Sequence, residues 1–150
     1  MGKRRITNKK TIDEIIKKAK VCRIGLSDNN MPYVLPLSFG YEDNCLYFHS
    51  SQQGKKIDIL RKNNNVCFEV DVDVELVKAQ KACKWDVKYY SVIGFGKAYF
   101  VEDLAEKRKA FGIIMAHYSS EAFDYPEKKL VKAALIRIEI ESMTGKKSGY

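Results

Sequence analysis

The segment from Tyr47 to Lys56 combines residue types that can bind a phosphate group. Alternating apolar and polar residues up to His49 predict a strand, and Gly54 permits a tight turn into a helix. The free N–H groups at a helix start favour an anion, especially where hydroxyl and ammonium groups lie nearby. Two interpretations stay open: a phosphate site, or an ordinary strand-to-helix turn with solvated lysines. The hydroxyl and ammonium groups are those of Ser50, Ser51, Lys55 and Lys56.

The preceding strand, predicted over residues 33–41, has two unlike faces. Pro36 has no N–H to donate to a neighbouring strand, which predicts an edge strand or a bulge. Two explanations are equally open: a protected edge strand, or a strand whose unpaired backbone groups meet a flat ligand. The apolar face carries Leu35, Leu37, Phe39 and Tyr41, and the small face carries Val34, Pro36, Ser38 and Gly40.

Other reactive side chains are few. The four cysteines form no CxxC pair and the chain has only two histidines, so we expect neither a metal site nor disulfides. His117 falls at the end of an expected helix, where interaction with the helix dipole or exposure to solvent is the simplest interpretation. No pair of acid and base residues stands out, so the sequence assigns no catalytic residue.

The elements that position these residues suggest a mainly β fold with peripheral helices. Six strands with mostly short connections, one helix after the third strand and one before the last, predict a small antiparallel barrel. The first connections are too short for crossover helices and no GxGxxG is present, which argues against a dinucleotide-binding βαβ fold. The expected strands cover residues 21–27, 33–41, 45–50, 66–77, 91–101 and 133–141, and the expected helices begin at the Thr11–Glu14 capping box, after Gly54 and at Asp103.

The length of 150 residues predicts one domain over residues 1–150, with flexible ends at 1–9 and 147–150. The net charge of +8 is scattered along the chain, so one or two phosphate-sized sites are a better expectation than binding of duplex nucleic acid. There is no apolar run of about 20 residues and no secretory signal. We therefore expect a cytoplasmic protein without a membrane partner.

Five segments, in order and with similar gaps, resemble the pyridoxamine 5′-phosphate oxidase-like FMN-binding split barrels, and within them the nitroimidazole-resistance branch. The resemblance extends from about residue 10 to residue 147 and implies a six-stranded antiparallel split β-barrel. It also implies a homodimer with FMN at the subunit interface. The segments are Pro36–Tyr41, Leu46–Ser50 with Gly54–Lys56, Asn65–Val70, Tyr89–Ala98 and Thr144–Lys146.

The resemblance also implies a set of cofactor-binding residues. Those expected along the isoalloxazine are Pro36, Leu37, Ser38 and Phe39; those around the phosphate or the flavin edge are His49, Ser50, Lys55 and Lys56; those from the loop and strand near the interface are Trp85, Tyr89 and Ser91; and Lys146 is expected from the partner. Only one of Lys55 and Lys56 is expected to face the phosphate, because helix neighbours diverge by about 100°. Structural alternatives stay open for His49, as a hydrogen-bonded strand residue, and for Trp85, as loop packing.

The function implied is an FMN-dependent oxidoreductase that passes electrons or hydride to a small acceptor, with nitro-aromatic compounds as the example from that branch. NAD(P)H is a plausible donor, although no segment indicates a site for it. The alternative is a flavin or haem carrier without turnover, and a weaker third is a nucleic-acid-associated domain. Since the chain ends at Lys146–Tyr150 without an arginine-rich segment, oxidation of pyridoxamine phosphate is not expected.

Overall fold

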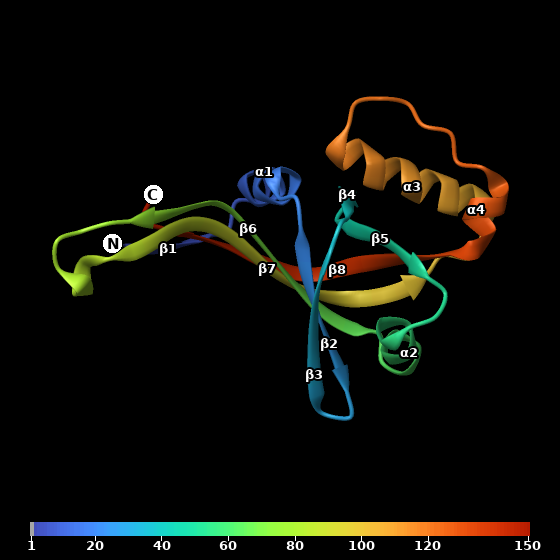
Figure 1. The fold of residues 1–150 in the computed structure, drawn as a ribbon, viewed down its shortest axis with the longest axis horizontal. Coiled ribbons are helices and arrows are strands. Elements are labelled where there is room, and N and C mark those ends of the chain that lie inside the picture. Colours follow the sequence, from blue (N-terminus) through green and yellow to red (C-terminus); the bar gives the residue numbers. More distant parts are fainter. Residues whose placement is uncertain (1) are drawn as a thin grey trace.

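The computed structural model describes residues 2–150 as a curved antiparallel sheet with helices at its periphery (Figure 1). The mainly β architecture predicted from the sequence is confirmed. In chain order the elements are β1 (Lys3–Ile6), α1 (Lys9–Lys18), β2 (Cys22–Asp28), β3 (Met31–Leu37), β4 (Gly40–Glu42), β5 (Cys45–Ser51), α2 (Lys55–Lys62), β6 (Asn65–Val77), the 3-10 helix η1 (Ala82–Lys84), β7 (Asp86–Phe100), α3 (Leu104–Tyr118), α4 (Glu127–Lys132) and β8 (Ala133–Ser148).

The sheet is a barrel that is left open along one line. Its strand order is β3-β2-β6-β7-β8-β5-β4, and β1 pairs with β8 outside that path. β3 and β4 lie at opposite ends of this order, yet only Ser38 and Phe39 separate them in the chain. The two ends of the sheet are therefore connected through the chain rather than through a ladder of hydrogen bonds, as in a split barrel.

The strand count is eight rather than the six expected. One extra strand, β1, lies within the segment expected to be flexible. The other arises because the strand expected over residues 33–41 is interrupted between β3 and β4. At the interruption, the N–H of Phe39 donates to the Tyr118 hydroxyl at 3.0 Å instead of to a neighbouring strand.

The segments expected to be flexible ends, 1–9 and 147–150, include a paired strand and a stacked ring. β1 pairs with β8 from Lys3↔Ser148 to Ile6↔Gly145, and the Tyr150 ring stacks on Tyr90 at 4.6 Å. The physical reason is that β8 continues beyond its pairing with β5, which leaves a free edge, and that Ile6 packs against the core. Residue 1 lies outside the described residues.

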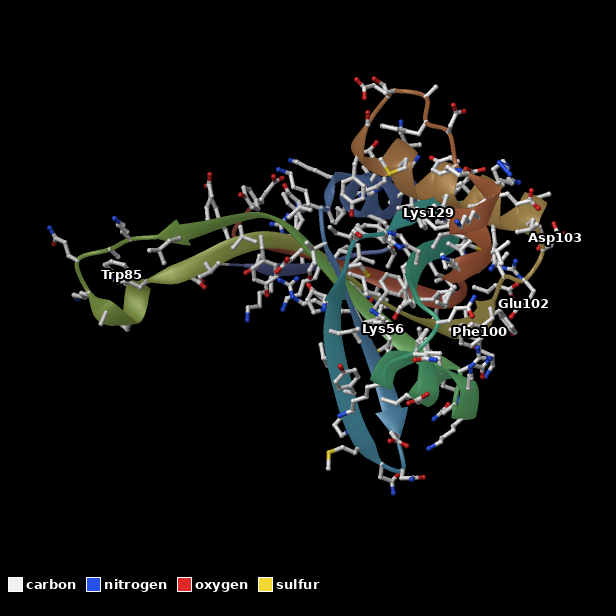
Figure 2. The ribbon with its side chains drawn as sticks, turned by 45° about the vertical axis from the view of Figure 1, so that its right-hand side comes forward. Lys56, Trp85, Phe100, Glu102, Asp103 and Lys129 are labelled. Carbon is white, nitrogen blue, oxygen red and sulfur yellow. The ribbon has the colours of Figure 1, made fainter. Side chains whose placement is uncertain are left out.

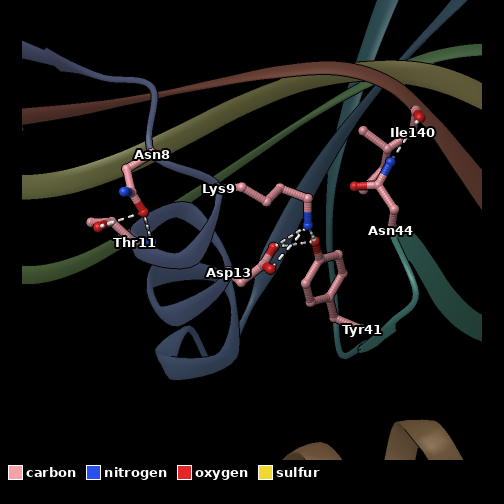
Figure 3. A network of polar contacts seen from close by, with 7 residues as sticks. All are labelled: Asn8, Lys9, Thr11, Asp13, Tyr41, Asn44 and Ile140. Carbon is pink, nitrogen blue, oxygen red and sulfur yellow. Dashed lines mark hydrogen bonds and ion pairs between the residues drawn. The ribbon is translucent and has the colours of Figure 1, made fainter.

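The helix starts also differ in detail. α1 begins two residues before Thr11, because the side chain of Asn8 accepts the Thr11 N–H at 3.1 Å and caps the helix (Figure 3). The start of α3 is as expected, since Asp103 accepts the Glu106 N–H at 3.0 Å. α4 was not predicted, because six residues are too few to show a helical period.

The core lies between the inner face of the sheet and the helices α1 and α2. Gly94 is part of this packing, since a Cβ there would lie 2.2 Å from the Phe68 ring. α3 covers β4 and β5 on the other side, with a smaller buried cluster beneath it. The largest fully buried side chains include Phe39, Phe48, Phe68, Ile16, Ile24 and Ile136.

Candidate functional site

The opening of the barrel places the candidate phosphate-binding turn opposite the proline-containing strand. β4 pairs with β5 only as far as Gly40↔Tyr47. Beyond that point the two segments part, because β3 pairs with β2 and β5 pairs with β8. The same register, if continued, would set Ser38 opposite His49. We call the residues on the two sides the split site: Pro36, Leu37, Ser38, His49 and Ser50, with Lys55 and Lys56 at the start of α2.

The β3 side of the split site is an exposed strand edge. β3 is the terminal strand of the sheet, which confirms the edge strand predicted from Pro36. Pro36 and Ser38 are exposed, whereas Leu37 is half-buried and packs against the core. Phe39 is different, because its ring is buried and its N–H is held by Tyr118. Within residues 2–150, the backbone groups along the outer edge of β3 have no strand partner, so they are available to a flat ligand.

The start of α2 is an uncapped helix terminus. Gly54 has a φ of 135°, no side chain caps the helix there, and a Cβ on Gly54 would meet nothing within 4 Å. Ser51 does not serve as a cap, because its hydroxyl donates to the Gln53 carbonyl at 2.7 Å. The first helical hydrogen bond runs from Asp58 N–H to the Gly54 carbonyl, so the three N–H groups before it remain available to an anion.

The two lysines of this turn point to different neighbours. The ammonium of Lys55 lies 4.5 Å from the centre of the Tyr33 ring on β3. Lys56 lies close enough to His49 to act on its charge. Desolvation of the His49 ring, which lies 5.2 Å from the Phe111 ring, lowers the pKa of His49, and the charge of Lys56 lowers it further. His49 is therefore neutral at pH 7.

The remaining expected residues come from other elements of the fold than the split site. The arm, residues 71–91 of β6, η1 and β7, extends outward and carries Trp85 near its tip, far from Lys56 (Figure 2). The Trp85 indole donates to the Ala79 carbonyl at 2.6 Å, which supports the loop-packing interpretation. Ser91 pairs with Lys146, and the Lys146 ammonium lies 5.6 Å from the Tyr89 ring. Within one chain, the expected cofactor residues thus form two separate groups.

The two hollows beside α1 lie apart from the split site. Two hollows of about 300 and 310 Å³ flank the C-terminal half of α1, and Lys18, Val72 and Asp73 line both. Pro36, Ser38 and His49 are all exposed. A ligand at the split site of a single chain would therefore remain open to solvent on one side.

Sequence reasoning missed the side chains that hold the split in place. The Tyr118 hydroxyl donates to the Lys20 carbonyl at 2.7 Å while it accepts the Phe39 N–H. His117, expected at the dipole or in solvent, instead bonds the Ala19 carbonyl and packs its ring 4.3 Å from that of Phe39. No local signal reveals these contacts, because 79 residues separate Phe39 from Tyr118.

A second missed network holds α1 against β4 (Figure 3). Tyr41 donates to the Asp13 carboxylate at 2.5 Å, and Lys9 pairs with the same carboxylate at 2.7 Å. Burial raises the pKa of Asp13, but the hydrogen bonds from Lys9 and Tyr41 outweigh it, so that this pKa lies below its usual value. Burial and the Asp13 charge raise the pKa of Tyr41. The network fixes the residues just after Phe39, next to the split.

Within residues 2–150, no group of three or more His, Cys, Asp or Glu side chains is placed to hold a metal ion. Cys22, Cys45, Cys67 and Cys83 are all free thiols. In the same range, no helix is long and apolar enough to cross a membrane.

Comparisons with known proteins agree with this geometry. The family model described as pyridoxamine 5′-phosphate oxidase matches residues 8–147. A Bacteroides thetaiotaomicron VPI-5482 protein, assigned provisionally to 5-nitroimidazole antibiotic resistance, is 37% identical and covers 97% of this chain and 89% of its own, with a TM-score of 0.86. No curated protein matches the chain.

Two more distant structures share the fold. An FAD-binding protein from Mesorhizobium loti is 24% identical over 99% of this chain and 100% of its own, with a TM-score of 0.72. The FAD and heme binding protein from Mycobacterium smegmatis is 17% identical over 97% of this chain and 74% of its own, with a TM-score of 0.86.

Proposed function

The chain belongs to the pyridoxamine 5′-phosphate oxidase family, and from this premise we propose that it is a flavoprotein that holds FMN at the split site and passes electrons through it to a small acceptor. The observation that carries the proposal is the juxtaposition of an uncapped, lysine-bearing helix start with the free edge of β3. The first fits a phosphate, and the second fits a planar ring.

The chain's own residues would bind and orient the cofactor. The phosphate would occupy the first turn of α2, where backbone N–H groups and the ammonium groups of Lys55 and Lys56 favour a dianion. The isoalloxazine would follow Pro36 to Ser38 through backbone groups, with neutral His49 on the opposite side of the split. When bound, the flavin supplies the redox chemistry.

We further propose a homodimer that closes the site. Alternate residues of β7 present an apolar outer face, on which Ile93 is 48% and Phe95 57% exposed. Large apolar side chains exposed in a row are typical of an interface. A second copy would cover this face, and its arm would bring Tyr89 and Ser91 toward the split site.

The proposed acceptor class follows the 37% identical relative, which is linked to nitroimidazole compounds, so we propose a nitro-aromatic or similar small acceptor. NAD(P)H is the proposed donor, in a cytoplasmic setting. A second candidate is flavin or haem binding without turnover. One observation favours it: His49 is the one imidazole of the split site, and burial lowers its pKa, so acid–base chemistry has a single candidate.

The test is an absorbance spectrum of the purified protein before and after addition of FMN, followed by removal of free ligand. About one retained flavin per chain supports the site, and no retention by a folded protein contradicts it. Anaerobic addition of NADPH, then of a nitro-aromatic acceptor, separates the two functions. Bleaching and recovery of the flavin bands indicate an oxidoreductase, whereas stable oxidised bands indicate a binding protein.

A further inference from the structure

The pairing of β1 with β8 concentrates positive charge in a way that the split site does not explain. Arg5 lies directly opposite Lys146, and Arg4 directly opposite Lys147. Like charges directly opposite on antiparallel strands destabilise the pair. The strands nevertheless pair over four residues, so a compensating anion is a physical explanation for the arrangement.

The register divides these cations between two faces of the sheet. Ile6 packs against the core, so Arg4, two residues away, lies on the same side with its partner Lys147. Lys3, Arg5 and Lys146 lie on the opposite side. We call these three residues the basic corner. A hollow of about 240 Å³ lies at this place, lined by Lys3, Arg4, Arg5, Thr144, Gly145 and Lys146.

Charges within residues 2–150 do not neutralise the basic corner. None of its three cations forms an ion pair with a carboxylate in that range. Asp71 lies in the same row of the sheet, across Ser91 from Lys146, but Arg23 engages it at 3.4 Å. The corner therefore keeps a positive charge that no neighbouring carboxylate within residues 2–150 neutralises.

A buried hydroxyl without a partner lies on the same face. Ser148 pairs with Lys3 on one side and with Tyr89 on the other, so its side chain shares their face. It is 1% exposed, and its Oγ has no hydrogen-bond partner among the described residues. A buried hydroxyl without a partner costs free energy, but Ser148 does not line the hollow itself.

We propose that the basic corner binds the diphosphate group of a nucleotide. Three cations match the charge of two phosphates better than that of one, and the hydroxyl of Thr144 adds a donor. The inference rests on the proposed function for its place in the dimer: Lys146 pairs with Ser91, so the corner would lie beside the partner's split site and extend it. In this proposal Lys146, which the resemblance places at the flavin, binds a second anion. The diphosphate can belong to a nicotinamide dinucleotide or to the adenine half of FAD.

The experiment is calorimetric titration of the purified protein with pyrophosphate and with ADP at low ionic strength. In the double variant Arg5→Gln/Lys146→Gln we expect at least about tenfold weaker binding. The matched control Lys128→Gln/Lys129→Gln removes the same charge from exposed residues of α4, and we expect a change of less than about twofold.

Further arms identify the source of the diphosphate. If the Arg5/Lys146 variant loses NADPH binding, the corner binds the electron donor. If instead the wild type retains FAD better than FMN and the variant does not, the corner binds the flavin. Absence of pyrophosphate and ADP binding, equal losses in the two double variants, or binding of duplex DNA alone would overturn the proposal. Since FMN retention is measured in each variant, failure of the corner and failure of the split site can be told apart.

Discussion

The hydroxyl of Tyr118 accepts the N–H of Phe39 at 3.0 Å, which ties the last residue of α3 to the junction between β3 and β4. The same hydroxyl donates to the Lys20 carbonyl at 2.7 Å. One side chain thereby satisfies two backbone groups from two different connections. Because the junction is where the barrel opens, this contact sets the position of the β3 side of the split site.

Tyr118→Phe tests this relationship. Loss of the hydroxyl leaves the Phe39 N–H and the Lys20 carbonyl without their partner, and we expect a loss of about 1–2 kcal/mol in the free energy of unfolding. Urea denaturation measures it. Tyr125→Phe is the control, since that hydroxyl makes a single, longer bond of 3.3 Å to the Phe111 carbonyl. Equal losses in the two variants would contradict the special role of Tyr118.

Removal of the α2 cations tests the phosphate position. We expect Lys55→Ala and Lys56→Ala together to weaken FMN binding by at least about tenfold, because each charge-assisted contact contributes about 1.5–3 kcal/mol. Fluorescence titration of FMN measures it. Lys62→Ala, in the last turn of the same helix, is the matched control and should bind FMN like the wild type. Unchanged FMN affinity in a folded double variant would place the phosphate elsewhere.

The lowered pKa of His49 predicts a pH dependence of stability. Below its usual value of 6.5 the unfolded chain takes up a proton at His49 before the folded chain does. The stabilising contribution is therefore fully present above pH 6.5 and is lost as the pH falls toward the folded-state pKa. We expect His49→Gln to lose less stability than the wild type between pH 7.5 and 5.5 in urea denaturation. Parallel pH profiles would refute this.

Lys107 is a buried cation that holds the C-terminal end of α4 in place. Its ammonium donates to the carbonyls of Leu130 and Ala133 at 3.2 and 2.9 Å. Lys107→Met keeps much of the volume but leaves these carbonyls without a charged donor, so we expect a loss of about 2–3 kcal/mol in unfolding free energy. Lys109→Met, exposed on the same helix, should change it by less than about 0.5 kcal/mol.

The Lys107→Met variant also tests whether α4 supports the split site. Gln52 donates to the Val131 carbonyl at 2.9 Å, so α4 supports the loop that leads into α2. We therefore expect faster hydrogen exchange in residues 52–57 of Lys107→Met than in the Lys109→Met control. Exchange confined to α4 itself would show that the two elements are not coupled.

A charge on the outer face of β7 tests the proposed homodimer. Phe95→Glu places a carboxylate on an apolar surface, which would have to be desolvated on association, so we expect the variant to be monomeric and to lose FMN. Light scattering after size exclusion measures the mass. Met31→Glu, also exposed, at the tip of the β2–β3 hairpin, should leave the dimer intact. If neither substitution dissociates the dimer, the interface does not lie on the outer face of β7.

Much of the fold could be predicted because its signals are local. Alternation of buried and exposed residues over residues 66–77 identifies β6, and Gly54 before two lysines identifies the start of α2. Pro36 marks β3 as an edge strand because proline lacks a donor. Each of these inferences depends on a few neighbouring residues and on backbone chemistry.

The sequence misses features that distant segments decide. β1 forms because the end of β8 offers an unpaired edge, which residues 1–9 do not encode by themselves. The site residues inferred from the resemblance stay a prediction; within one chain, Trp85 lies near the tip of the arm and far from Lys56, because β6 and β7 continue well beyond the barrel.

The sequence by itself determined the mainly β architecture, the edge strand and a basic, glycine-led helix start suited to an anion, because periodicity and side-chain chemistry act over a few residues. Only the tertiary structure decided that the barrel opens at Ser38 and Phe39, that Tyr118 holds that opening, and that Arg5 meets Lys146. These features depend on which chain segments meet, and the pairing of residues far apart in sequence is settled by packing over the whole chain.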